Sequence, residues 1–318
     1  MTHETHFGGS QDVDSEFARA VIAGLSAPHK HLPCRYFYDA VGSQLFEDIT
    51  RVPEYYPTRT EAALLQESAA AIAARTQPGT VMVEFGSGSS LKTEILLAAM
   101  HDLAAYVPID VSGDALREAN SRLASRFPKL KVLPVVGDFA AELPLSGELA
   151  RAPRLGFFPG STIGNLVPKD AVDLLAQFAR QLDGGRLVVG VDLRKDLSVL
   201  TPAYNDAAGV TANFNLNLLT RINRELGADF DRRGFRHEAV WNEQEGRIEM
   251  HLVSRKRQDV HLLDHDFSFA EGERIHTENS YKYTLDGFRK VAEAAGWAVT
   301  SVWTDARDWF SLQELSRA

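Results

Sequence analysis

The feature that most constrains the fold is an alternation of short apolar runs with helical patterns between residues 61 and 193. The first run, Thr80–Phe85, is apolar and ends at a Gly-rich turn, which is typical of a buried strand. Similar runs are Tyr106–Ile109, Val132–Val136, Leu155–Phe158 and Leu187–Val191, and the helical patterns are Glu61–Arg75, Lys92–His101, Ala115–Phe127 and Ala171–Leu182. This alternation predicts an α/β fold with a parallel, doubly wound sheet.

The alternation stops after Asp192. Ala207–Leu226 has one helical pattern, and the runs at Ala239–Val240 and Arg247–Val253 predict a β-hairpin. A helical pattern returns at Thr284, and the strand-like runs Trp297–Trp303 and Phe310–Leu315 follow it. We therefore expect a sheet domain of residues 61–193 and 281–318, a smaller α+β lobe of residues 11–60 and 194–280, and disorder in residues 1–10.

Composition narrows the class of protein. The 318 residues are 44% hydrophobic, enough for a full α/β core and a second lobe. A formal net charge of -9 gives no electrostatic reason to bind nucleic acid or an anionic membrane, so neither is expected as a partner. The start of the chain lacks the apolar core of a signal peptide, and no apolar run is long enough to span a bilayer. With Cys34 as the single cysteine, a cytoplasmic location is expected.

Three predicted strands end in residues suited to binding a nucleoside. The first leads into the turn Gly86-Ser87-Gly88 and the second ends at Asp110, whose carboxylate can accept hydrogen bonds from ribose hydroxyls. The third leads to Asp138 and Phe139, which can meet an adenine amino group and its ring. This order matches the S-adenosylmethionine site of Rossmann-like methyltransferases.

Two other interpretations of this turn stay open. A dinucleotide site favours a third glycine where Leu91 stands, and Glu84 would repel a pyrophosphate, whereas its charge suits the cationic amino acid end of S-adenosylmethionine. Alternatively, the two glycines only turn a strand into a helix.

Several long polar and aromatic strings are hard to explain by packing alone. They lie at residues 36–43, 53–61, 160–165, 204–211, 223–230 and 247–250. Together they closely resemble the histidine Nα-methyltransferases of ergothioneine biosynthesis, and the resemblance extends from about His31 to the final strands. It implies a Rossmann-like methyltransferase domain with a second, substrate-capping domain. The implied reaction is the S-adenosylmethionine-dependent trimethylation of free L-histidine, through its methylated intermediates, to the betaine hercynine.

The resemblance also implies roles for individual residues. Tyr56, Asn165 and Tyr204 are expected to hold the substrate's amino and carboxylate groups, with Tyr38 close to the methyl-transfer site. Tyr38 and Asn165 are the expected catalytic residues. The imidazole ring is expected to meet Glu278 and Ser280, with Met250 lining the same pocket, and the cofactor to meet Gly86, Lys92, Asp110, Asp138 and Phe139.

Each assignment has a structural alternative. Asn165 can be a turn residue that satisfies its own backbone, the three tyrosines can pack amphipathically, Glu278 can be an exposed strand residue, and Met250 can be core. A metal site at His261, Asp264, His265 and Asp266 is disfavoured, because their close spacing fits a polar turn. Cys34 has no evident base beside it for nucleophilic catalysis.

Two other functions also stay open. The first is methylation of another aromatic amino acid, and the second is a protein that binds S-adenosylmethionine without turnover.

Overall fold

The computed structural model describes residues 10–88, 90–139, 143 and 145–318. It divides into two compact units. The smaller unit is Met1–Tyr55, Ser198–Asn242 and Ile248–Asn279, and the larger unit is Tyr56–Leu197, Glu243–Arg247 and Ser280–Ala318. Of the stretch expected to be disordered, residues 1–9 lie outside the described residues. Ser10 is the first residue of helix α1 (Ser10–Ser26).

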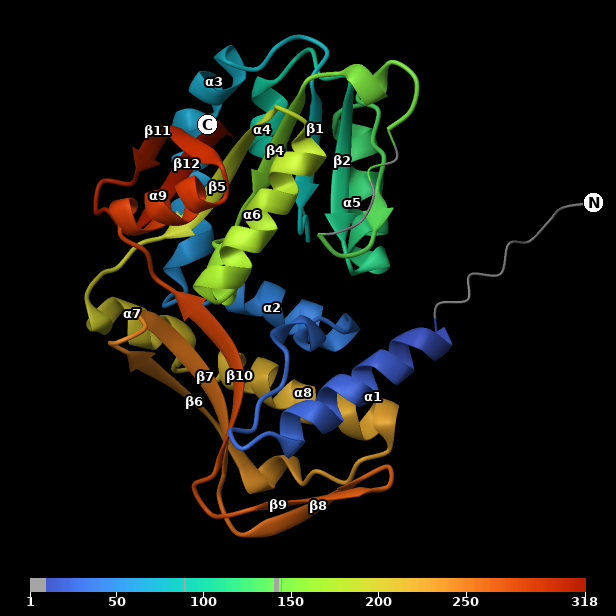
Figure 1. The fold of residues 1–318 in the computed structure, drawn as a ribbon, viewed down its shortest axis with the longest axis vertical. Helices are drawn as coiled ribbons and strands as arrows, with labels where there is room; N and C mark the ends of the chain where they lie inside the picture. Colours follow the sequence, from blue (N-terminus) through green and yellow to red (C-terminus); the bar gives the residue numbers. More distant parts are fainter. Residues whose placement is uncertain (1–9, 89, 140–142, 144) are drawn as a thin grey trace, which may run out of the picture. The chain divides into compact units, whose positions relative to one another are not determined.

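The larger unit is built on a seven-stranded sheet with the order β11-β12-β5-β4-β1-β2-β3 (Figure 1). Its strands are β1 (Val81–Phe85), β2 (Ala105–Asp110), β3 (Val135–Val136), β4 (Arg154–Phe158), β5 (Arg186–Asp192), β11 (Trp297–Thr304) and β12 (Phe310–Arg317). Strands β1 to β5 pair in parallel, whereas β12 runs antiparallel to both β5 and β11. The predicted Rossmann-like α/β class is confirmed.

Helices cover both faces of this sheet, as Figure 1 shows. One core contains side chains of α6 (Pro168–Leu182) and α9 (Leu285–Ala294). The core on the opposite face contains side chains of α3 (Tyr56–Ala74), α4 (Thr93–Ala99) and α5 (Gly113–Arg126). The central strands are therefore apolar on both faces, which explains their nearly continuous hydrophobic runs.

Parallel pairing brings the carboxyl ends of neighbouring strands to one edge of the sheet. Phe85 at the end of β1 is in register with Ile109 of β2, and Phe158 at the end of β4 is in register with Val189 of β5. Ligands of open α/β sheets bind at this edge. The sequence placed its candidate nucleoside-binding residues at the ends of β1, β2 and β3, and the structure aligns these ends.

Two predicted elements of the larger unit differ from those observed. The strand expected over Val132–Val136 is only β3, and Val132 forms an isolated bridge with Tyr106. Pro134 interrupts the pairing because it has no backbone N–H to donate. Helix α3 begins at Tyr56, one turn before the expected start at Glu61.

The smaller unit combines helices with antiparallel strands. Its helices include α1, α2 (Ala40–Arg51), α7 (Leu197–Tyr204) and α8 (Val210–Leu226), with 3-10 turns at Cys34–Phe37 and Arg232–Gly234. Strands β6 (Phe235–Asn242), β7 (Arg247–Ser254) and β10 (Arg274–Tyr281) form a sheet in the order β10-β7-β6, and β8 (Gln258–Leu262) pairs with β9 (His265–Phe269). The predicted hairpin corresponds to β6 and β7, whereas β8, β9 and β10 were not predicted.

The single helix expected over Ala207–Leu226 is wrong at its start. Helix α8 begins at Val210, and α7 ends before it at Tyr204. The Asp206 carboxylate accepts hydrogen bonds of 2.8 Å from the backbone N–H groups of Val210 and Thr211, and Gly209 has φ +71°. This cap begins the new helix, because it satisfies amide groups that have no partner within the first turn.

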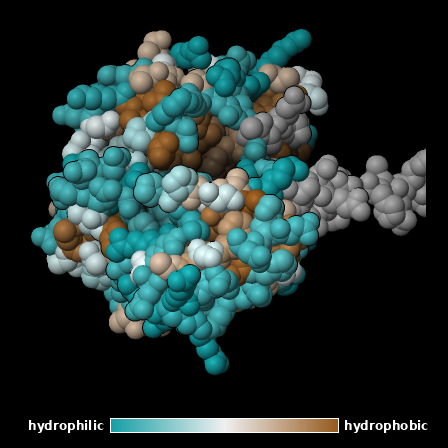
Figure 2. Space-filling view, turned by 60° about the horizontal axis from the view of Figure 1, so that its bottom comes forward, coloured by the Kyte–Doolittle hydropathy of each residue, from teal (hydrophilic) through white to brown (hydrophobic). Residues whose placement is uncertain are grey.

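The face shown in Figure 2 carries mostly hydrophilic side chains, with hydrophobic ones gathered in separate patches. Within the part of the chain that the structure describes, no helix is both long and apolar enough to cross a membrane.

Candidate active site

The turn after β1 is held against the end of β2 by Asp110. One carboxylate oxygen accepts a 2.8 Å hydrogen bond from the N–H of Gly88, and the other accepts a 2.9 Å bond from the N–H of Ser112. Gly86 and Gly88 have φ of +75° and +48°, a region that L side chains rarely adopt. The two glycines therefore fit a turn whose backbone is open to a ligand, and no described atom lies within 4 Å of a Cβ built on Gly88.

Phe139 places an aromatic ring beside this turn. A Cβ built on Gly86 would lie 3.2 Å from Cε1 of Phe139. The ring packs edge-on against Phe158 at a centroid distance of 5.3 Å, and the backbone carbonyl of Phe139 accepts a 2.8 Å hydrogen bond from Gln177. Its neighbour Asp138 is exposed. Gly86 and Phe139, which the sequence assigned to the same ligand, are thus in direct proximity.

Lys92 is held by an ion pair within the larger unit. Its ammonium group contacts the buried carboxylate of Glu61, which also accepts hydrogen bonds of 2.9 and 3.0 Å from the N–H of Gly160. This contact links α3 to the turn after β4. The position of Lys92 at the carboxyl edge agrees with the predicted cofactor role, which stays a prediction.

Glu84 is buried, and its contacts do not favour the direct cofactor contact suggested by the sequence. Its carboxyl group accepts hydrogen bonds from the hydroxyls of Thr93 and Tyr106. Burial raises the pKa of Glu84 to about 8, although these hydrogen bonds oppose the shift. The group is therefore satisfied within the protein and is readily protonated.

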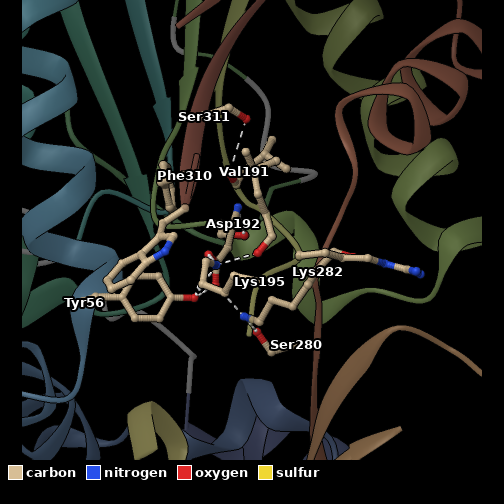
Figure 3. Close-up of polar contacts among 12 residues, drawn as sticks. Tyr56, Val191, Asp192, Lys195, Ser280, Lys282, Phe310 and Ser311 are labelled. Atoms are coloured by element: carbon tan, nitrogen blue, oxygen red, sulfur yellow. Dashed lines mark hydrogen bonds and ion pairs between the residues drawn. The ribbon is translucent and has the colours of Figure 1, made fainter. Parts of the chain in front are cut away.

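A buried charged cluster in the larger unit surrounds Asp192, the last residue of β5 (Figure 3). The hydroxyl of Tyr56 lies 2.8 and 2.7 Å from the two carboxylate oxygens of Asp192. The ammonium groups of Lys195 and Lys282 both contact the same carboxylate. Lys195 also donates a 2.7 Å hydrogen bond to the Tyr56 hydroxyl, and Lys282 a 2.8 Å bond to the Ser280 hydroxyl. We call these five residues the Asp192 cluster.

The Asp192 cluster is almost completely shielded from solvent. The side chains of Asp192, Lys195 and Lys282 are 1%, 4% and 0% exposed. Burial alone would raise the pKa of Asp192, but the two ammonium groups hold it below its ordinary value. Burial lowers the pKa of Lys195 to about 8 against the attraction of Asp192. Two cations therefore share one anion in a site that is shielded from water.

The turn after β4 fixes the backbone around Asp192. Ser161 has φ +56°, and its hydroxyl accepts a 2.9 Å hydrogen bond from the N–H of Asp192. A Cβ on Gly164 would lie 2.8 Å from the carbonyl oxygen of Tyr281, so only glycine fits there. Asn165 ends this 3-10 turn, Thr162–Asn165, and is half-buried. Asn165 thus follows β4, and Asp192 ends the adjacent strand β5 at the same edge of the sheet.

Four predicted site residues, Tyr38, Tyr204, Met250 and Glu278, belong to the smaller unit. Tyr38 packs edge-on against Phe46, with a centroid distance of 5.7 Å, and the backbone carbonyl of Tyr204 faces a ring nitrogen of His237 at 2.8 Å. The carbonyl of Met250 accepts a 3.0 Å hydrogen bond from the hydroxyl of Thr277, the residue before Glu278. Met250 and Glu278 therefore lie close together on β7 and β10.

Cys34 has the environment of an inert thiol. Burial, and to a smaller extent the nearby charge of Glu278, raises the pKa of Cys34 to about 12. Among the described residues, no group of three or more His, Cys, Asp or Glu side chains could hold a metal ion. The segment containing His261, Asp264, His265 and Asp266 includes the turn between β8 and β9.

Comparison with known proteins identifies the family. Residues 17–317 match the family model "Histidine-specific methyltransferase, SAM-dependent". The chain belongs to this family. It is 46% identical over 300 residues to "Histidine N-alpha-methyltransferase" of Mycolicibacterium smegmatis, an alignment that covers 92% of each chain. It is 27% identical over 300 residues to "Ergothioneine biosynthesis protein 1" of Neurospora crassa, covering 88% of this chain and 32% of that protein.

A solved structure with a similar fold is the CcbJ methyltransferase from Streptomyces caelestis. It has a TM-score of 0.47 and 16% identity, and the match covers 88% of this chain and 100% of that chain.

S-adenosylmethionine is the cofactor of this histidine-specific methyltransferase family. The carboxyl edge of the sheet fits its adenosyl group, because Leu91, Val111 and Val136 follow or end β1, β2 and β3 and are 55%, 55% and 67% exposed. Apolar side chains at this edge suit an aromatic base. Asp110 and Phe139 are the residues that would hold the ribose and adenine groups.

The charged members of this methyltransferase's Asp192 cluster were not predicted from the sequence. Asp192 directly ends a predicted strand, as Asp110 does, and that signal was available. Lys195 and Lys282 carried no such signal, because they lie in loops after β5 and β10. The structure does bring together Tyr56 and Ser280, two predicted substrate residues, through contacts with these three charged groups.

Proposed function

We propose that this chain transfers three methyl groups from S-adenosylmethionine to the α-amino group of free L-histidine and forms hercynine, as a step of ergothioneine biosynthesis. The observation that carries the proposal is 46% identity to a histidine Nα-methyltransferase over 92% of both chains. The ergothioneine protein of Neurospora crassa supports the pathway. Histidine and its methylated intermediates are then the substrates.

Methyl transfer requires the amine lone pair to be in line with the sulfonium methyl group that the cofactor supplies. The protein's main task is therefore to orient the amine and keep it deprotonated. We assign this task to Asn165, whose amide can both donate and accept, and to Tyr56, which both lie at the carboxyl edge of the larger unit. We assign Tyr38 and Tyr204 to the same substrate.

Recognition of the imidazole ring is assigned to β10. Glu278 and Ser280 are two residues apart on this strand, and alternate residues of a strand point to the same face. A carboxylate and a hydroxyl together can meet both nitrogens of an imidazole ring, which an apolar aromatic ring cannot match. Met250, on neighbouring β7, is assigned to the wall of the same pocket.

The cytoplasmic location and the absence of a nucleic-acid partner remain predictions that rest on the single cysteine and the net charge of -9. Neither is required by the proposed reaction.

The test is to incubate the protein with excess S-adenosylmethionine and each free amino acid in turn, and to follow the products by mass spectrometry. Histidine should gain three methyl groups, and the monomethylated form should not accumulate as the end product. A time course that ends at one methyl group would contradict trimethylation. Faster methylation of another aromatic amino acid would instead support that substrate, and cofactor binding without any product would support a non-catalytic protein.

A further inference from the structure

Lys195 and Tyr56 form a close, buried contact that the proposed substrate-binding role of Tyr56 does not require. The ammonium nitrogen lies 2.7 Å from the Tyr56 hydroxyl and 4.5 Å from the centroid of its ring (Figure 3). The hydroxyl is also within 2.8 Å of both carboxylate oxygens of Asp192. The proton of the Tyr56 hydroxyl therefore has two groups within hydrogen-bond distance, the carboxylate of Asp192 and the amine of Lys195.

The charge balance of the Asp192 cluster favours the loss of one proton. Two lysines share one carboxylate, and an excess buried cation is costly unless a further partner or deprotonation relieves it. Lys282 is fully buried and divides its donors between Asp192 and Ser280. Lys195 is 4% exposed and lies between the exposed residues Arg194 and Asp196, so it is the most exposed of the three charged groups.

The proposed reaction generates a proton at each methylation. A protonated α-amine has no lone pair, so the ammonium group must lose a proton before each of the three transfers. After each of the first two transfers, the product is again an ammonium ion and must lose another proton. A proton acceptor beside the amine would therefore act in every cycle.

We propose, on the basis of the function proposed above, that Lys195 accepts this proton and that the Tyr56 hydroxyl transfers it. In this step the substrate N–H bond breaks and a new O–H bond forms on Tyr56, while the former Tyr56 proton moves to neutral Lys195. The amine keeps the electron pair and attacks the methyl carbon, and the carbon–sulfur bond breaks with its pair passing to sulfur. Lys195 then releases its proton to water.

The electrostatic environment of Lys195 agrees with this role. Burial lowers the pKa of Lys195 to about 8, and the positive charge of Lys282 acts in the same direction, while Asp192 and Asp305 oppose the shift. The other polar groups against its ammonium nitrogen are the Tyr56 hydroxyl and the backbone carbonyl of Leu193. A minor fraction of Lys195 is therefore neutral near pH 7, and a general acid or base is most effective when its pKa is close to the working pH.

The decisive variants are Lys195→Arg and Lys195→Met. Arginine keeps the positive charge beside Asp192 but does not deprotonate, whereas methionine removes both properties. We expect both to lower the single-turnover rate with saturating cofactor and histidine by roughly a hundredfold near pH 7. In the wild type the rate should level off above about pH 8, and in both variants it should continue to rise with pH. Lys169→Met, at an exposed lysine of α6, is the matched control and should keep the wild-type profile.

Rescue by arginine would overturn the proposal, because it would show that only the charge of Lys195 matters. An unchanged profile in Lys195→Met would overturn it as well. Circular dichroism and cofactor binding show whether the variants fold. If neither does, the pH dependence of the wild-type rate decides, because a rate that keeps rising well beyond pH 8 excludes Lys195 as the proton acceptor. A wild-type protein that does not methylate histidine would instead refute the proposed function.

Discussion

The carboxylate of Asp110 lies 2.8 Å from the backbone nitrogen of Gly88 and fixes the turn after β1 to the end of β2. The residue predicted to hold the cofactor ribose therefore also shapes the turn predicted to approach the cofactor. A substitution at Asp110 therefore affects both the predicted ribose contact and the shape of the turn. Control variants at exposed residues separate these two effects from a general loss of stability.

Asp110→Ala should weaken binding of S-adenosylmethionine by about 10- to 100-fold, since losing hydrogen bonds to a carboxylate costs roughly 1–3 kcal/mol. Isothermal titration calorimetry measures the change. Asp102→Ala, at an exposed residue before the start of β2, is the control and should bind normally. Unchanged affinity in Asp110→Ala would remove this residue from the cofactor site.

Gly86→Ala should lower both stability and cofactor affinity. A left-handed φ costs a non-glycine residue roughly 1–2 kcal/mol, and the added Cβ would also meet Phe139 at 3.2 Å. Gly79→Ala is a close control, because Gly79 has φ +76° but no described atom within 4 Å of an added Cβ. Thermal unfolding should show both variants destabilised, with cofactor affinity reduced only in Gly86→Ala. Equal affinity in the two would mean that the Gly86–Phe139 contact does not shape the site.

Glu278→Ala should shift specificity away from histidine. The change deletes a charge-assisted hydrogen bond worth roughly 1.5–3 kcal/mol for imidazole, but relieves an unpaired charge for an apolar aromatic ring. The ratio of the two kcat/KM values should move by about ten- to a hundredfold toward the apolar substrate. A smaller residue at Met250 should add to the shift, and Glu271→Ala, at an exposed glutamate, should leave the ratio unchanged. Equal loss on every amino acid would show that Glu278 does not select the substrate.

Glu84 predicts a pH dependence of stability. Its folded-state pKa is raised from 4.5 to about 8, so the folded protein binds this proton more tightly than the unfolded chain. The resulting contribution of Glu84 to the free energy of unfolding is fully present below about pH 4.5 and is lost as the pH rises through about 8. Glu84→Gln, which stays neutral, should therefore gain stability relative to wild type across this window in urea denaturation series. Glu67→Gln, at an exposed glutamate of α3, is the control and should show the pH dependence of the wild type. If the free energy of unfolding of Glu84→Gln runs parallel to that of the wild type over this pH range, the pKa of Glu84 is not raised.

The sequence was sufficient to predict the parallel sheet and the glycine turn after β1. Strands β1, β2, β4 and β5 are short apolar runs between helical patterns, and Gly86 and Gly88 mark a backbone that side chains would obstruct. These signals are local, because hydrophobic period and turn chemistry are set by neighbouring residues. The start of α8 also depends on a local signal, the Asp206 cap, but this cap was not predicted from the sequence.

Only the tertiary structure decided how Asp192, Lys195 and Lys282 are paired with Tyr56. These residues come from β5, from the loops after β5 and β10, and from α3, and they meet because parallel pairing and the turn after β4 bring these segments to one edge of the sheet. The sequence determines that the side chains are charged. Their burial, their partners and the resulting pKa values depend on distances between segments far apart in the chain, and those distances exist only after the sheet has formed.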